Sequence, residues 1–308
     1  MRAIAMGVHV LDVLVRPVEA IPEGQGGQLV EEIRMTAAGS AGGPALVLAR
    51  LGADVSSAGA IGTDPAGDLL VRLLERDGVD TSLLVRREDV QTSASVLPIR
   101  PDGSRPAFHV IGANGTYGPD DAPWDAIASA THLHLGGPEF MGGEAAARIL
   151  AFARERGVTT SADVLAPGDQ GLIEWIAPAL AHLDWFLPND EQAVGFTGES
   201  GVEAACRALV ERGAGGVAAT CGAEGVLLVD GSGSERVPAF AVDVVDTTGC
   251  GDAFSAGFLR GLSLGRSPRD AAVLGCATAA LVAQGLGTDA GQYDLATVEA
   301  FAASTATR

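Results

Sequence analysis

The sequence predicts an α/β fold in which helices cover both faces of a mostly parallel β-sheet. Short runs rich in β-branched and apolar residues alternate with segments whose apolar residues recur on one helical face. Strands that alternate with helices in this way usually pair in parallel and are buried on both sides. The chain has 308 residues, of which 47% are hydrophobic, so it can bury a large core. Because no fixed-period repeat or low-complexity linker interrupts the pattern, we expect a single domain over residues 1–308.

The first strand is predicted at residues 2–8, an apolar run without the cleavage pattern of a signal peptide. Helices are expected between the strands, for example where apolar residues share one face in 145–153 and 204–210. A last apolar run, residues 240–245, is predicted to end a strand. The remaining predicted strands are 55–61, 131–135, 158–162, 185–187 and 217–220.

The uncharged stretch between Asp270 and Asp289 is long enough to raise the question of a membrane span. It is rich in Ala and Gly and has acidic flanks, which are not typical of a membrane anchor. We therefore predict a buried helix here and expect no membrane partner.

Two segments break the alternation, residues 13–36 and residues 92–112 with the turn Pro101-Asp102-Gly103. Both resemble extended strands joined by turns rather than helices. Together they could form a small sheet over one end of the core. Two unrelated surface hairpins are the alternative.

The formal net charge of -19 disfavours a nucleic acid or an anionic membrane as partner, because these are held by basic patches. A neutral substrate fits this charge better. All 20 basic residues are arginine, which excludes a P-loop lysine and a Schiff base. If the protein transfers phosphate, it has to use backbone N–H groups, arginine and a metal ion.

The cysteines are too far apart in sequence for a zinc or redox motif, so we expect free thiols and a cytoplasmic protein. The histidines His9, His132 and His134 lack a third ligand nearby, which favours structural roles over a metal site. The four cysteines are Cys206, Cys221, Cys250 and Cys276.

The most informative segment is Asp246 to Asp252, with the sequence Asp-Thr-Thr-Gly-Cys-Gly-Asp, directly before an apolar helical run. Small residues at the start of a helix leave N–H groups free, and the helix dipole attracts anions there. Asp252, in the first turn, could then reach a hydroxyl beside a bound phosphate. A tight turn with a helix cap is the alternative. We expect the helix terminus to keep Asp252 ionised and to lower the pKa of the Cys250 thiol.

This segment resembles the second signature of the ribokinase-like, or PfkB, family of carbohydrate and nucleoside kinases, Asp-Thr-Thr-Gly-Ala-Gly-Asp, with Cys250 in place of alanine. The resemblance spans nearly the whole chain, in the family's order. Residues 38–52 are similar to its first signature, 188–198 to its metal-linked segment and 220–225 to its nucleotide-binding turn. It implies a ribokinase-like fold with a small β lid, formed here by about 13–36 and 92–112. In several members such lids pair between subunits, which would make a homodimer.

The resemblance also implies roles for individual residues in ATP-dependent phosphoryl transfer. Asp252 aligns with the catalytic base, and Gly249, Cys250 and Gly251 would offer N–H donors to the phosphoryl group. Asp246 and Thr248 align with positions that hold a potassium-type ion in many relatives, although a turn cap by Asp246 stays open. Mg²⁺ is expected with ATP. The substrate-binding candidates are Asp12, Gly39, Gly42 and Gly43, and the nucleotide-binding candidates are Asn189, Thr220, Gly222 and Gly225.

The sequence departs from the family at three positions that bear on the site, one of which is Ala38, where the first signature begins with glycine. Gly43 stands where the family has asparagine, and Gln192 where it has glutamate, which puts the sugar and metal contacts in doubt. Arg100 and Arg105 flank the predicted lid turn; they could touch a substrate, but solvated hairpin charges are the more usual arrangement.

We therefore expect an ATP-dependent kinase that phosphorylates a hydroxyl of a small, neutral, polyhydroxylated sugar-like molecule. A nucleoside kinase is the alternative on the same fold, and the low aromatic content of 5% favours the sugar. A catalytically silent sugar-binding regulator is an alternative of another class, prompted by Gly43 and Gln192. A nicotinamide-dependent dehydrogenase is disfavoured because no Gly-x-Gly-x-x-Gly follows the first strand.

Overall fold

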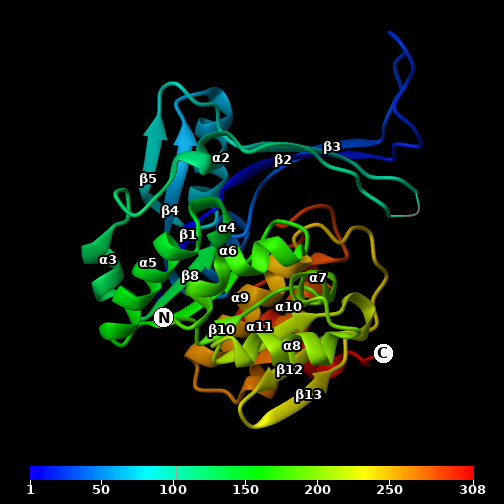
Figure 1. Ribbon diagram of the computed structural model, residues 1–308. Helices are drawn as coiled ribbons and strands as arrows, with labels where there is room; N and C mark the ends of the chain where they lie inside the picture. Colours follow the sequence, from blue (N-terminus) through cyan, green and yellow to red (C-terminus); the bar gives the residue numbers. More distant parts are fainter. Residues whose placement is uncertain (102) are drawn as a thin grey trace.

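The computed structural model describes residues 1–101 and 103–308 (Figure 1). Asp102, at the centre of the predicted lid turn, lies outside the described residues. The described strands form a nine-stranded sheet, in the order β13-β12-β11-β10-β9-β8-β1-β4-β5, and a four-stranded sheet. The predicted α/β class with a mostly parallel sheet is confirmed.

In the large sheet, the seven strands β5, β4, β1, β8, β9, β10 and β11 pair in parallel in this spatial order. The strands β12 and β13 then continue the sheet in antiparallel fashion. The six strands predicted at 2–8, 55–61, 131–135, 158–162, 185–187 and 217–220 lie within one residue of observed strands at either end. The strands are β1 (Arg2–Gly7), β4 (Asp54–Gly62), β5 (Asp80–Arg87), β8 (His132–Gly136), β9 (Thr159–Asp163), β10 (Trp185–Phe186), β11 (Gly216–Thr220), β12 (Val226–Asp230) and β13 (Gly233–Val237).

Helices cover both faces of this sheet, because alternate residues of its strands are apolar and point to opposite sides. Ala3 and Ala5 of β1 belong to one buried cluster, whereas Ile4 and Met6 belong to the other. The first cluster includes α1 (Gly42–Arg50), α2 (Pro65–Arg76), α9 (Cys250–Ser263), α10 (Pro268–Val282) and α11 (Leu295–Ser304). The second includes α3 (Trp124–Ser129), α5 (Gly143–Glu155), α6 (Gln170–Leu180), α7 (Asp190–Thr197) and α8 (Val202–Glu211). The short α4 (Pro138–Met141) lies just after β8.

The uncharged stretch after Asp270 forms most of α10, which is largely buried against α9 and α11. The predicted buried helix is thus confirmed. Among the helices of the described residues, none has the length and apolar character needed to cross a bilayer.

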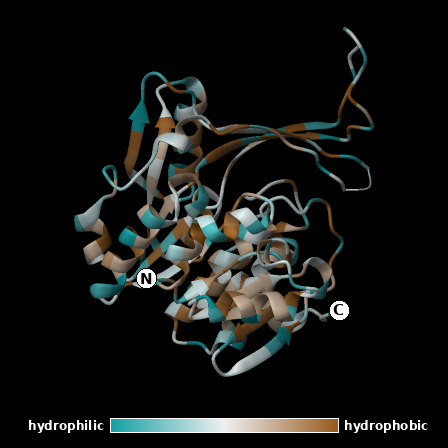
Figure 2. Cartoon of the chain, in the orientation of Figure 1, coloured by the Kyte–Doolittle hydropathy of each residue, from teal (hydrophilic) through white to brown (hydrophobic). Residues whose placement is uncertain are grey.

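The segments 13–36 and 92–112 come together in the four-stranded sheet, which we call the small sheet. Its strands are β2 (Val10–Arg16), β3 (Glu32–Ala38), β6 (Ala94–Pro98) and β7 (Phe108–Val110), in the order β3-β2-β6-β7. The long strands β2 and β3 extend well beyond the helices of the large sheet (Figure 1). Hydrophobic residues occur along these strands as well as in the interior (Figure 2).

The strand end predicted at residues 240–245 is wrong. Only Phe240 forms a bridge, with Thr307, and the residues after it have no strand geometry. The backbone of this segment bonds to the chain end and to the C-cap of α10, as in Val245 N–H to Ala283 O at 2.8 Å. The apolar side chains of this segment line a cavity rather than one face of a sheet.

Candidate active site

The turn from Asp246 to Gly249 leads directly into α9 and forms the base of the candidate site. Gly249 is the N-cap with φ of 78°, and a Cβ there would lie 2.6 Å from Cα of Thr288, so only glycine fits. Within the described residues, the N–H groups of Gly249, Gly251 and Asp252 have no acceptor. The N–H of Cys250 donates to Thr247 O at 3.2 Å, which corrects its assignment as a free donor. The turn therefore offers three free amides at a helix N-terminus, an arrangement suited to a phosphate.

Asp252 lies in the first turn of α9 and lines a cleft of about 950 Å³. The cleft lies between the small sheet and the large sheet with its helices, which we call the body. Burial raises the pKa of Asp252 well above its usual value, and the nearby carboxylates of Asp163 and Asp12 raise it further. Arg105 acts in the opposite direction. The expectation that the helix terminus keeps Asp252 ionised at an ordinary pKa is therefore wrong, because desolvation and like charges outweigh the dipole. Once deprotonated, such a carboxylate is a stronger base.

The substrate-side candidates divide into two groups. Asp12 and Gly39 line the cleft, and burial raises the pKa of Asp12 to about 6 in spite of its hydrogen bond with Ser95. Gly42 and Gly43 lie behind the cleft lining, at the start of α1. A Cβ on Gly43 would overlap the carboxylate of Asp252, so a side chain at position 43 would require Asp252 to move.

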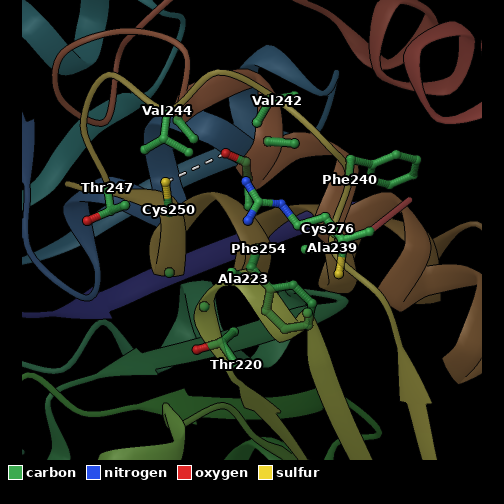
Figure 3. Close-up of a pocket in the computed structure, with 17 residues that line it drawn as sticks. Thr220, Ala223, Ala239, Phe240, Val242, Val244, Thr247, Cys250, Phe254 and Cys276 are labelled. Carbon is green, nitrogen blue, oxygen red and sulfur yellow. Dashed lines mark hydrogen bonds between the residues drawn. The ribbon is translucent and has the colours of Figure 1, made fainter. Parts of the chain in front are cut away.

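A second cavity of about 260 Å³ adjoins the cleft on the other side of the turn (Figure 3). Its walls are mostly apolar and include Phe240, Val242, Val244 and Phe254. The predicted nucleotide-binding residues Thr220, Gly222 and Gly225 line it as well. The residues shared by the cavity and the cleft are Thr220, Gly222, Thr247 and Gly251.

Asn189 also lines the cleft, but its side chain is already engaged at the start of α7. Its Oδ1 accepts from Gln192 N–H at 2.7 Å, and Gln192 Oε1 accepts from Asn189 N–H at 2.9 Å. Gln192 Nε2 donates to the carbonyls of Val164 and Ala166, both at 3.0 Å. A glutamate, being acceptor-only when ionised, could not make these last two bonds. Gln192 thus fastens the segment 164–166, which forms part of the cleft wall.

The oxygens expected to hold a potassium-type ion are engaged by protein donors. Asp246 Oδ1 accepts from Thr248 N–H at 3.1 Å and from Thr248 Oγ1 at 2.9 Å, and Asp246 Oδ2 accepts from Gly287 N–H at 3.2 Å. Arg105 Nε, from the small-sheet side, donates to Thr248 Oγ1 at 2.9 Å and lies 3.7 Å from Asp246 Oδ1. A guanidinium thus lies beside both side chains that were expected to hold the ion.

The Cys250 thiol does not have the lowered pKa predicted for it. Burial, with a contribution from the Asp246 carboxylate, raises the pKa of Cys250 to about 12. The apolar surroundings outweigh the helix dipole, so we expect an unreactive thiol at neutral pH.

His132 and His134 have structural roles, as predicted. His132 Nε2 and His134 Nδ1 both lie 2.9 Å from Ser161 Oγ in the buried core. Desolvation lowers the pKa of His132 to about 3, so it is neutral. Across residues 1–101 and 103–308, no group of three or more His, Cys, Asp or Glu side chains is arranged to hold a metal ion.

Two residues of the cleft were missed or underrated from the sequence. Asp163 is the last residue of β9, at the carboxyl edge of a parallel sheet, where ligand-binding residues often lie. That position was a usable signal. Arg105 was considered a solvated hairpin charge, yet it reaches the turn. Because the chain has no lysine, an arginine near a predicted phosphate site should be considered as a phosphate ligand.

Comparison with known proteins identifies relatives of this chain. The pattern of the pfkB family carbohydrate kinases matches residues 7–294. An ATP-dependent ribose-1-phosphate kinase of Halopiger xanaduensis is 33% identical over 258 residues, covering 84% of this chain and 83% of that protein. A 2-dehydro-3-deoxygluconokinase of Bacillus subtilis is 29% identical over 263 residues, covering 81% of each. The crystal structure of a ribokinase from Thermotoga maritima superposes with a TM-score of 0.81 at 24% identity, covering 97% of this chain and 98% of that one, and so shares the fold.

Proposed function

Because this chain belongs to the pfkB family of carbohydrate kinases and is an ATP-dependent carbohydrate kinase, we propose that Asp252 is its general base toward a hydroxyl of a small sugar or sugar-like molecule. One observation supports this most. Asp252 lies beside the free amides of Gly249 and Gly251, where an apolar cavity meets a polar cleft. A protein that only bound a sugar would not need a carboxylate next to an anion-binding turn.

In this proposal the adenine ring of ATP occupies the 260 Å³ cavity, and the ATP phosphates pass Gly222 and Thr247 toward the turn. The amides of Gly249, Gly251 and Asp252 stabilise the charge on the transferred group. As the acceptor oxygen bonds to phosphorus and the bond to the ADP oxygen breaks, Asp252 takes the hydroxyl proton. Mg²⁺ would be held by phosphate oxygens and water and would neutralise part of their charge. The carboxylates of Asp190 and Glu191 in the cleft are compatible with a hydrated cation nearby.

The acceptor would bind beneath the small sheet, with hydroxyls directed at Asp12 and Asp163. The carboxylates of Asp12, Asp163 and Asp252 face a single guanidinium, that of Arg105, within the described cleft lining. This balance favours a neutral polyhydroxylated acceptor. The two relatives above are named for anionic substrates, so charged sugars must be tested too. A nucleoside kinase is a second candidate, because Phe140 also lines the cleft and could stack against a base.

A potassium-type ion at Asp246 and Thr248 belongs to the proposal only if Arg105 moves away. Comparison of activity in KCl with activity in tetramethylammonium chloride tests this. We further propose a cytoplasmic location, supported by four cysteines that are all free thiols.

The experiment is to measure ADP release from MgATP with ribose, ribose 1-phosphate, 2-dehydro-3-deoxygluconate and a nucleoside as acceptors. We expect strong stimulation by one sugar and formation of its phosphate ester. ADP release that is the same with and without every acceptor would contradict the proposal.

A further inference from the structure

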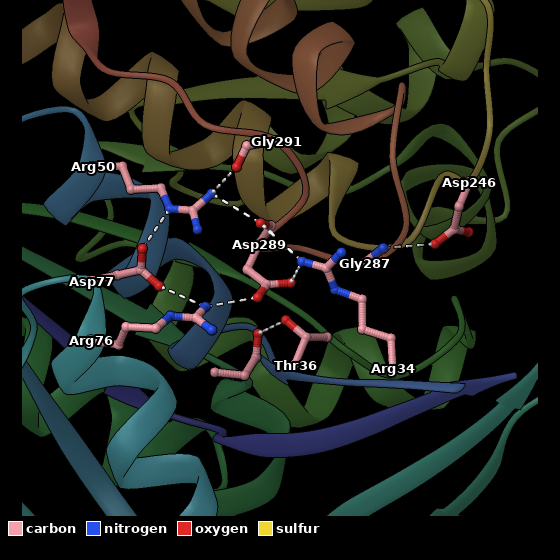
Figure 4. Close-up of polar contacts among 10 residues, drawn as sticks. Arg34, Thr36, Arg50, Arg76, Asp77, Asp246, Gly287, Asp289 and Gly291 are labelled. Carbon is pink, nitrogen blue, oxygen red and sulfur yellow. Dashed lines mark hydrogen bonds and ion pairs between the residues drawn. The ribbon is translucent and has the colours of Figure 1, made fainter. Parts of the chain in front are cut away.

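The segment between α10 and α11, residues 283–291, lies between the small sheet and the turn at Asp246 to Gly249. Asp289 is a charged residue of this segment, with only 3% of its surface exposed. Asp289 Oδ1 lies 3.0 Å from Arg34 NH2, and Asp289 Oδ2 lies 2.8 Å from Arg76 NH2 (Figure 4). Arg50 NH1 donates to the backbone oxygens of Asp289, at 3.1 Å, and Gly291, at 3.2 Å.

These arginines come from two different parts of the fold. Arg50 and Arg76 belong to α1 and α2, which pack on the large sheet, and both are also paired with Asp77. Arg34 belongs to β3 of the small sheet. The Asp289 carboxylate is therefore a point at which the small sheet is fastened to the body.

Apolar packing reinforces this link on the underside of the small sheet. Leu286 forms a buried cluster with Leu14, Leu97 and Ile99 of the small-sheet region. Gly287 lies so close to β3 that a Cβ there would be 3.1 Å from Cγ2 of Thr36. A displacement of the small sheet would thus push directly on residues 286 and 287.

The other side of the same segment contacts the phosphate-binding turn. Gly287 N–H donates to Asp246 Oδ2 at 3.2 Å, and Thr288 packs directly against Gly249, leaving no room for a side chain there. Thr288 also lines the cleft, and its buried Oγ1 has no hydrogen-bond partner among the described residues. Residues 286–289 therefore touch the small sheet on one side and the amide-bearing turn on the other.

We propose that residues 286–289 transmit the position of the small sheet to the phosphate-binding turn, and that Asp289 is a positioning residue for phosphoryl transfer. This inference rests on the proposed function of the turn. When the small sheet seats on an acceptor, the Arg34–Asp289 pair and Leu286 set the positions of Gly287 and Thr288. These in turn hold Asp246 and Gly249, so the free amides point at the transferred group. An ion pair with one partly exposed partner contributes little to stability, and the coupling gives this one a role in the reaction.

The test uses the full chain and an acceptor-independent probe. MgADP binding is measured by calorimetry with and without aluminium fluoride, which stands in for the transferred phosphoryl group. The gain in affinity on adding aluminium fluoride reports how well the turn holds that group. We expect Asp289→Asn and Arg34→Gln each to reduce this gain about tenfold, the size of typical coupling effects, while affinity for MgADP alone changes less than twofold.

Arg86→Gln is the matched control, since it removes another arginine ion pair, that with Asp68, away from this segment. The control should retain the full gain. Because Asp289→Asn and Arg34→Gln act on one pair, the double variant should lose no more than Asp289→Asn alone. Kinetically, kcat should fall with an unchanged KM for MgATP.

An unchanged gain in both folded variants, or an equal loss in Arg86→Gln, would overturn the inference. If Asp289→Asn fails to fold, as judged by its melting curve, Arg34→Gln decides, because its partly exposed side chain is less important for the core. Failure of the proposed function is a separate result, seen as no gain from aluminium fluoride in the unaltered protein, and it would remove the inference with it.

Discussion

Asp12, Asp163 and Asp252 come from three distant parts of the sequence and meet in one cleft. Burial is the first cause of the raised pKa of each, and the like charge of neighbouring carboxylates adds to it at Asp12 and Asp252. A general base near the start of a helix would ordinarily be too acidic to be effective. The shared burial of these carboxyls raises the pKa of Asp252, which would make it a stronger base in the proposed reaction.

The pKa of Asp12, raised by burial to about 6, predicts pH-dependent acceptor binding. Above this pH the ionised carboxylate accepts hydrogen bonds from substrate hydroxyls; below it the group is protonated and this interaction weakens. We expect the Kd of the acceptor, measured without nucleotide, to be constant above about pH 7 and to rise up to about tenfold per pH unit below pH 6. In Asp12→Asn the Kd of the acceptor should already be high at pH 7. The further rise below pH 6 that is due to Asp12 should be absent. A constant Kd for the unaltered protein from pH 7 to 5 would contradict this assignment.

At the residue scale, the sequence was sufficient for the turn but not for its electrostatics. Gly249 and Asp252 could be proposed because small residues before an apolar helix have a local physical meaning and because the segment resembles a signature of the family. The pKa values of Asp252 and Cys250 could not, because they depend on burial and on Asp163, Asp12 and Asp246. Those contacts exist only in the folded chain.

At the element scale, α7 and the segment 164–166 form one hydrogen-bonded unit through Gln192. Its amide donates to the carbonyls of Val164 and Ala166 and closes the capping box with Asn189. Glu139 Oε1 holds the same segment by accepting from the N–H groups of Leu165, at 2.8 Å, and Ala166, at 3.0 Å. This wall of the cleft is fixed from both sides.

Replacing Gln192 with glutamate, the residue usual in the family, is therefore expected to be harmful here. Gln192→Glu would direct a carboxylate at two carbonyl oxygens and lose two donated bonds, costing about 1–3 kcal/mol of unfolding free energy. Urea unfolding and hydrogen exchange of residues 163–168 measure the effect. The exposed Gln25→Glu is the matched control and should be neutral. Equal stability of the two variants would show that Gln192 does not hold this segment.

Most elements were predictable because hydrophobic periodicity acts locally, as the close agreement of the strands β1, β4, β8 and β9 shows. The failure at 240–245 has a clear cause. The apolar run there predicts a strand, but a strand needs a neighbour, and this segment borders a cavity. Sequence patterns do not reveal which partner an apolar face will meet.

At the scale of the whole molecule, the small sheet exposes an apolar row on the face away from the cleft. Met35, Val13, Val96 and Phe108 lie side by side across its four strands by their pairing register. Met35 is 47%, Val96 44% and Phe108 58% exposed. An aligned apolar row of this kind is typical of an interaction surface. We propose that two copies of the chain pair through it, as the predicted lid-to-lid homodimer requires.

Sedimentation analysis tests this pairing. We expect the unaltered protein to be a dimer at micromolar concentration and Val96→Glu to be a monomer, because burying an unpaired charge at the centre of the row is costly. Leu264→Glu, an exposed leucine at the end of α9, is the control and should remain dimeric. A monomeric unaltered protein would exclude the lid as a dimer interface under these conditions.

The most direct test of the whole account is the turnover number of Asp252→Asn with MgATP and the best acceptor. If Asp252 takes the hydroxyl proton beside the amides of Gly249 and Gly251, kcat should fall about 10²–10⁴-fold, the usual contribution of a general base. The Kd of MgADP should change little, since the nucleotide cavity is intact. An unreduced kcat in a folded Asp252→Asn protein would contradict the central claim.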